Sequence, residues 1–204
     1  MLHHINQYKE ANVNKKYKFI WIGPERVGSR TTAKIFTFCG FMCREKQLSF
    51  ANTFNYTHNS EIPEEYKDYK TICSARNPYS RTLSLYKNFT YSGDTGGNKT
   101  FKEYVLGLTC GNPEEAFKDN GSKYKTFVNP VLEKQPDYVI KLENFYEDIK
   151  KIPFIYNHLT EKQLEMMCDH GKEIDEWESY YDQEMKDLVY EHLKHHFDMW
   201  GYEK

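Results

Sequence analysis

The sequence predicts an α/β fold: a single domain with a central parallel sheet flanked by helices. Three short apolar runs, over residues 17–23, 70–75 and 138–142, have the length and the flanking turn residues that are typical of buried strands. The strands alternate with segments of helical periodicity, which is the pattern of a parallel sheet with crossover helices. Because 204 residues is the length of one ordinary domain, we assign residues 1–204 to it.

The first strand and helix form one α/β unit, joined by a glycine-containing turn. The run YKFIWIG at residues 17–23 ends in Gly-Pro, and a helix is predicted over residues 26–41. That helix has Gly28 and Ser29 near its start, four apolar residues in its middle, and Gly40 as its stop signal.

The remaining elements follow the same alternation. The strand at residues 70–75 precedes a predicted helix over residues 79–89, with Pro78 suited to its first turn. Residues 43–66 are irregular, and the glycine-rich residues 91–99 form a loop. After the third strand, at residues 138–142, residues 180–200 are predicted to form a long amphipathic helix.

The charge balance limits the kind of partner. There are 28 Lys and Arg residues against 30 Asp and Glu residues, which excludes a globally basic nucleic-acid-binding protein. A membrane helix needs about 18 consecutive apolar residues, and no run in the sequence approaches that length, so we expect no membrane span. The first residues lack the apolar core of a signal peptide, so we expect a cytoplasmic location. Five scattered cysteines without a CxxC pair indicate reduced thiols and no zinc site.

The first candidate site is the turn GPERVGSRTT at residues 23–32. A helix start offers N–H groups and the positive end of the helix dipole to an anion, and Gly28 permits close approach of the backbone. Arg26 and Arg30 add positive charge, while Ser29, Thr31 and Thr32 add hydroxyl donors. The spacing of the two glycines matches the P-loop of nucleoside-triphosphate enzymes, but Ser29 stands where that loop has lysine, which weakens a kinase or NTPase without excluding it.

The second candidate site follows the second strand. Arg76 comes directly after residues 70–75, at the strand end where open α/β sheets bind ligands. Ser84 lies eight residues further on, two turns into the predicted helix. Both side chains are therefore placed to converge on one phosphate, although a structural ion pair of Arg76 is an open alternative.

Together the two segments resemble the cofactor-binding elements of the sulfotransferase superfamily, which uses 3′-phosphoadenosine-5′-phosphosulfate (PAPS). Residues 23–32 resemble its 5′-phosphosulfate loop, with Arg26 where lysine is usual, and RNPYSRTLSLY at residues 76–86 resembles its 3′-phosphate element. Residues 137–148 and 197–202 are similar to the third element and the tail of carbohydrate-type members. The resemblance implies the P-loop-like sulfotransferase fold and a PAPS site made by Arg26, Val27, Gly28, Ser29, Arg30, Thr31, Thr32, Arg76 and Ser84.

The same resemblance implies the reaction. The sulfuryl group would pass in line from PAPS to an acceptor hydroxyl, for which a glycan is favoured over a protein tyrosine or a small alcohol, with Arg26 stabilising charge and no metal required. His58 resembles the catalytic histidine of cytosolic sulfotransferases and is our choice of general base; Glu61 is its rival, and Glu45 a weaker one. A P-loop nucleotide kinase or NTPase and a non-catalytic nucleotide-binding relic are the alternatives.

Overall fold

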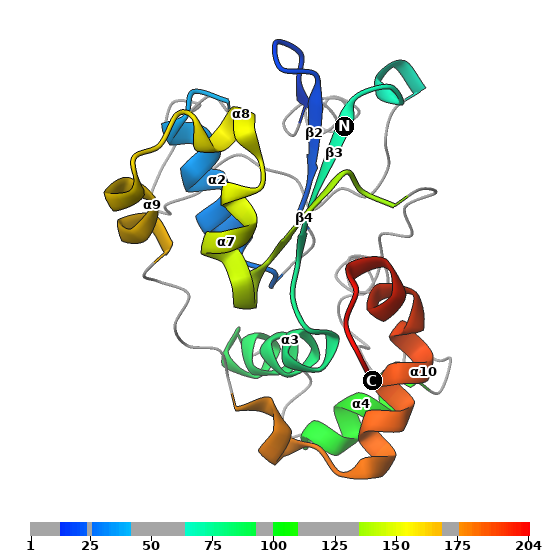
Figure 1. Cartoon of the computed structure of the whole chain (residues 1–204). Coiled ribbons are helices and arrows are strands. Elements are labelled where there is room, and N and C mark those ends of the chain that lie inside the picture. Colours follow the sequence, from blue (N-terminus) through cyan, green and yellow to red (C-terminus); the bar gives the residue numbers. More distant parts are fainter. Residues whose placement is uncertain (1–12, 24–25, 42–63, 93–99, 110–134, 169–175) are drawn as a thin grey trace, which may run out of the picture. The chain divides into compact units, whose positions relative to one another are not determined.

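A computed structural model describes residues 13–23, 26–41, 64–92, 100–109, 135–168 and 176–204 (Figure 1). The chain divides into two compact units. The sheet unit comprises Met1–Ala75 and Leu132–Lys172, and the helical unit comprises Arg76–Val131 and Glu173–Lys204. Each unit has a hydrophobic core of its own. That the two units fold as one domain stays a prediction.

The sheet unit contains a four-stranded sheet in the order β1-β2-β3-β4. Its strands are β1 (Val13–Asn14), β2 (Phe19–Ile22), β3 (Lys70–Ala75) and β4 (Tyr138–Lys141). The three strands predicted from apolar runs are confirmed, and they are parallel to one another. The edge strand β1 was not predicted, because two residues are too short to show a pattern, and it pairs antiparallel with β2.

One face of this sheet packs against helices. Trp21 lies opposite Ile72, and Ser74 lies opposite Ile140, so all four side chains point to the same face. The helices α2 (Ser29–Phe38), α7 (Phe145–Lys150), α8 (Pro153–Tyr156) and α9 (Glu161–Cys168) lie together beside the sheet (Figure 1). They bury Ala33, Ile35, Phe36, Phe145, Ile149, Ile155 and Leu164 against Phe19, Trp21, Ile72 and Ile140. Two short 3₁₀ helices, η1 (Glu64–Tyr66) and η2 (Leu142–Asn144), complete the described elements of the unit.

Helix α2 begins later than its sequence pattern predicts. The helix was expected over residues 26–41, but it starts at Ser29 and ends at Phe38. Arg26 has a φ of 65° and Gly28 a φ of 79°, and neither conformation is compatible with a right-handed helix. The three residues before Ser29 therefore form a separate turn, which matters for the site.

The helical unit is built from α3 (Pro78–Ser92), α4 (Phe101–Thr109), the 3₁₀ helix η4 (Trp177–Tyr180) and α10 (Gln183–Trp200). Its core is rich in aromatic rings: Tyr79, Phe101, Tyr104, Tyr181 and Phe197 pack with Leu83, Leu85, Val105, Met185, Val189 and Leu193. The helix predicted over residues 180–200 begins at Gln183, because the Asp182 side chain accepts a hydrogen bond from the Met185 N–H at 2.8 Å and caps the helix. Among the described residues, no helix is both long and apolar enough to cross a membrane.

Candidate functional site

Gly23, the residue directly after β2, lies on the Trp21 indole. A Cβ atom at Gly23 would be 2.6 Å from Trp21 Cζ2 and 3.3 Å from Ser29 Oγ. Any side chain at this position would therefore have to displace an indole that is itself only 1% exposed. Gly23 therefore lets the backbone leave β2 close to the start of α2.

Arg26, Val27 and Gly28 form the part of the turn that precedes the helix. The Val27 side chain is completely buried, whereas Arg26 is exposed. Gly28 combines a left-handed φ of 79° with close contact, since a Cβ atom there would lie 2.8 Å from Leu142 Cδ1. Val27 thus anchors the turn in the core, and only its main chain is placed to meet a ligand.

Several hydrogen-bond donors in the first turn of α2 are already used within the protein. The Thr31 and Thr32 N–H groups both donate to the Gly28 carbonyl oxygen, at 3.0 and 3.1 Å. The Thr32 hydroxyl, which is fully buried, donates to the same oxygen at 3.3 Å and lies 3.2 Å from Ser74 Oγ. The Thr32 hydroxyl, predicted as a cofactor ligand, is therefore bonded within the protein, while Arg30 is exposed and Thr31 half-buried.

The second candidate element belongs to the helical unit. The Arg76 guanidinium Nε donates to Ser80 Oγ at 2.9 Å, and Arg76 is only 6% exposed. The Asn77 side-chain oxygen accepts from the Tyr79 and Ser80 N–H groups at 2.9 and 3.2 Å, which starts α3. Ser80 and the buried Ser84 are four residues apart, so they lie on the same face of α3.

Ser80 is the residue of this element that sequence reasoning missed. Its hydroxyl orients the Arg76 side chain toward the face of α3 that also carries Ser84. The signal was present in the spacing, because Ser80 lies four residues after Arg76 and four before Ser84. Arg76 is therefore held by a hydroxyl of α3, the helix that follows it.

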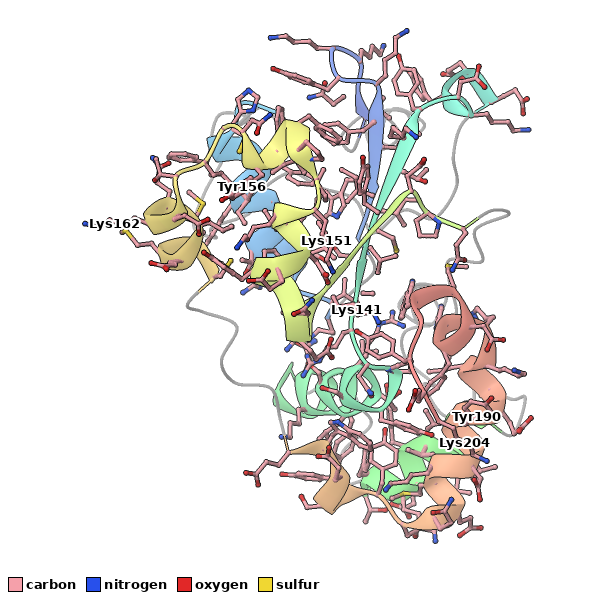
Figure 2. All side chains as sticks on the ribbon, viewed as in Figure 1. Lys141, Lys151, Tyr156, Lys162, Tyr190 and Lys204 are labelled. Atoms are coloured by element: carbon pink, nitrogen blue, oxygen red, sulfur yellow. The ribbon has the colours of Figure 1, made fainter. Side chains whose placement is uncertain are left out.

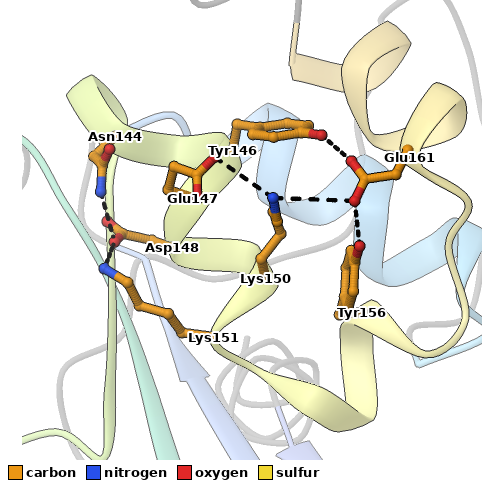
Figure 3. Close-up of polar contacts among 8 residues, drawn as sticks. All are labelled: Asn144, Tyr146, Glu147, Asp148, Lys150, Lys151, Tyr156 and Glu161. Carbon is orange, nitrogen blue, oxygen red and sulfur yellow. Dashed lines mark hydrogen bonds and ion pairs between the residues drawn. The ribbon is translucent and has the colours of Figure 1, made fainter.

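The third predicted element, residues 137–148, has a structural role where its contacts are described. Lys141 lies at the carboxyl end of β4 (Figure 2), and its backbone N–H donates to Asp148 Oδ2 at 2.9 Å. The other oxygen of the buried Asp148 accepts from Asn144 Nδ2 at 3.0 Å and pairs with Lys151 Nζ at 2.7 Å (Figure 3). Asp148 therefore joins β4 to α7.

A neighbouring polar cluster joins the short helices of the sheet unit. The Glu161 carboxylate on α9 accepts hydrogen bonds from the hydroxyls of Tyr146 on α7 and Tyr156 on α8, and Lys150 Nζ lies 4.0 Å away (Figure 3). These hydrogen bonds raise the pKa of Tyr156 and lower that of Glu161. Glu161 contacts each of the other three groups, so the cluster links α7, α8 and α9.

The sequence offers three candidates for the general base. His58, Glu61 and Glu45 lie outside the described residues, as do residues 43–63 and 93–99 of the two predicted loops. Within the described part of the chain, no group of three or more His, Cys, Asp or Glu residues could hold a metal ion.

A comparison with protein families identifies the chain. The model of the sulfotransferase family matches residues 9–203, which includes the turn before α2, the Arg76 element and the C-terminal helix. No curated protein and no solved structure matches the chain at a significant level. The strand, glycine turn and helix of the sheet unit fit the P-loop-like architecture of that family. From the extent of this match, the chain belongs to the sulfotransferase family and carries a domain for sulfuryl transfer.

Proposed function

We propose that the protein transfers the sulfuryl group of PAPS to an acceptor hydroxyl, with a glycan as the favoured acceptor. The observation that carries the proposal is the turn before α2, where Gly23 lies against the Trp21 indole and Gly28 adopts a φ of 79°. This geometry leaves the N-terminal end of a ten-residue helix beside a strand end, an arrangement that suits a phosphate or sulfonate group.

The roles of the residues follow from their chemistry. Arg26 and the backbone N–H groups at the start of α2 stabilise the negative charge that develops on the 5′-phosphate leaving group. Arg76, oriented by Ser80, and Ser84 bind the 3′-phosphate. His58 or Glu61 takes the proton of the acceptor hydroxyl as its oxygen forms a bond to sulfur and the bond from sulfur to the 5′-phosphate breaks. Adenosine 3′,5′-bisphosphate is then the second product.

Ligand-dependent thermal stability tests the cofactor class. Adenosine 3′,5′-bisphosphate without magnesium should raise the melting temperature, because a ligand at 100 times its Kd stabilises the folded state by about 2.7 kcal/mol. The Arg76→Ala variant should lose the shift, while Lys87→Ala, which removes a cation from the same helix, should retain it. Equal or greater stabilisation by ATP with magnesium would instead favour a nucleotide kinase or NTPase.

Turnover tests the base and the acceptor. Radiolabelled PAPS is offered with a panel of glycans, a tyrosine-containing peptide and small alcohols, and the preferred acceptor is then used with His58→Ala and Glu61→Ala. The variant that lacks the base should lose most of kcat, since general-base catalysis contributes about 10²–10⁴-fold. Unchanged turnover in both variants would refute both assignments, and sulfation of no acceptor would favour a nucleotide-binding relic.

A further inference from the structure

We infer that Trp21, Ser74 and Thr32 form a buried hydrogen-bond chain that positions the Gly28–Ser29 peptide for binding the anionic cofactor. The role of this hydrogen-bond chain in turnover rests on the proposed function, but its hydrogen bonds all lie within the sheet unit. The three residues are positioning residues: they act on the backbone of the turn, and none is argued to touch a ligand.

The chain links three elements. Trp21 Nε1 on β2 donates to Ser74 Oγ on β3 at 2.9 Å, and Ser74 Oγ lies 3.2 Å from Thr32 Oγ1 on α2. Thr32 Oγ1 in turn lies 3.3 Å from the Gly28 carbonyl oxygen. Ser74 and Thr32 are fully buried and Trp21 is 1% exposed, so these hydrogen bonds are formed away from water.

The two ends of the chain determine the direction of every proton in it. The indole N–H can only donate and the carbonyl oxygen can only accept, while each hydroxyl has a single proton. Thr32 gives its proton to the Gly28 carbonyl, and Ser74 accepts from Trp21. Ser74 therefore donates to Thr32, and the chain runs in one direction from the indole through both hydroxyls to the carbonyl.

The Gly28 carbonyl is held by three donors as a result. These are the Thr31 N–H at 3.0 Å, the Thr32 N–H at 3.1 Å and the Thr32 hydroxyl at 3.3 Å. In a planar trans peptide the C=O and the N–H point in opposite directions. Holding the Gly28 carbonyl toward the body of α2 therefore aims the Ser29 N–H out of the N-terminal end of the helix, where an anion binds.

Gly28 is the residue at which such a restraint has most effect. Glycine has access to more backbone conformations than any other residue, so its peptide can rotate more easily than its neighbours'. Ser74 also stands out on its sheet face, because Ile72 and Ile140 beside it on that face belong to the apolar core. The Ser74 hydroxyl accepts a hydrogen bond from Trp21 and donates one to Thr32, which an apolar side chain at this position could not do.

Matched substitutions test the inference. Thr32→Val keeps the shape of the side chain and removes the hydroxyl, whereas Thr32→Ser keeps the hydroxyl. The control is Thr82→Val. The Thr82 hydroxyl is equally buried and donates to the Pro78 carbonyl at 2.8 Å, so it bonds to the carbonyl four residues before it, as the Thr32 hydroxyl bonds to that of Gly28. Ser74→Ala interrupts the chain at its centre.

The expected result has a kinetic part and a ligand-free part. Thr32→Val and Ser74→Ala should lower kcat with PAPS about tenfold to hundredfold, the range for misplacement of binding groups, and Thr32→Ser should recover most of it. Thr82→Val should stay within about twofold of the native kcat, because the hydrogen bond from the Thr82 hydroxyl to the Pro78 carbonyl only supports the fold of α3. In the free protein, the NMR signals of the Ser29 amide and the Trp21 indole N–H should shift in Thr32→Val and not in Thr82→Val.

Each outcome decides one of the two claims. If the native protein neither binds adenosine 3′,5′-bisphosphate nor consumes PAPS, the proposed function fails, and the two NMR signals of the free protein still decide the positioning role. A folded Thr32→Val protein with native kcat and an unshifted Ser29 amide overturns the inference. Equal losses of kcat in Thr32→Val and Thr82→Val overturn it as well, because they would indicate general loosening.

Discussion

His196 on α10 provides a quantitative test of how the helical unit is packed. The residue is fully buried, and its ring stacks on Trp200 with 4.4 Å between ring centroids and an interplanar angle of 3°. Neither ring nitrogen has a hydrogen-bond partner among the described residues. Burial, with smaller effects of Arg81, His195 and His192, lowers the pKa of His196 from 6.5 to about 2.

The depressed pKa makes the stability of the fold depend on pH. The unfolded chain takes up a proton at this imidazole below about pH 6.5, while the folded chain keeps it neutral, so stability is present at higher pH and is lost as the pH falls. Between about pH 7.5 and about pH 5 the loss from this one group is about 2 kcal/mol. The same value holds for any folded pKa below about 4, since the folded ring is then neutral across this whole interval.

Urea unfolding at the two pH values, followed by tryptophan fluorescence and far-UV circular dichroism, measures the effect. The native protein should lose about 2 kcal/mol more between about pH 7.5 and about pH 5 than His196→Phe, which has no proton to bind. The control is Leu83→Val, a fully buried change in the same core, which should lower stability by about 1 kcal/mol at both pH values and keep the native pH dependence. An equal pH-dependent loss in His196→Phe and in the native protein would refute the reasoning.

Three further changes have expected outcomes. Gly28→Ala should cost about 1–2 kcal/mol of unfolding free energy, because alanine is strained at positive φ, and it should weaken binding of adenosine 3′,5′-bisphosphate in calorimetry; native affinity would contradict the site. Tyr181→Phe should cost about 1–2 kcal/mol in urea unfolding, since it removes a buried 2.9 Å hydrogen bond to the Tyr79 carbonyl, and an unchanged unfolding midpoint would argue against that bond. Asp182→Ala should lower the melting temperature through loss of the α10 cap, whereas Asp182→Asn, which keeps an acceptor, should lose less; equal losses would attribute the effect to charge.

Much of the fold could be predicted because it depends on local patterns. β3 has the predicted bounds, and α3 begins at Pro78, the residue expected in its first turn. The short helices α7, α8 and α9 were missed, because each covers too few residues for a helical period to show in the sequence. The late start of α2 was also missed, because nothing in the sequence marks Arg26 as a residue with positive φ.

The candidate site, like the fold, could be predicted only in part. The glycine turn and the Arg76 element were picked out by residue type and spacing, and the family that they resemble is confirmed by the match over residues 9–203. The ligand contacts of their residues stay predictions. What Thr32 does was not foreseeable: its hydroxyl was assigned to the cofactor, yet it is bonded to the Gly28 carbonyl and to Ser74. The same holds for Asp148, whose carboxylate joins β4 to α7.

The sequence by itself determined which segments become strands and helices and which turn has the composition of an anion site. These properties depend on neighbours a few residues apart, so a linear pattern carries them. Only the tertiary structure decided which hydroxyls are left for a ligand and which hold the backbone. Trp21 and Ser74 are separated by 53 positions, and their hydrogen bond exists because the register of β2 and β3 brings an indole N–H to a serine on the same buried face.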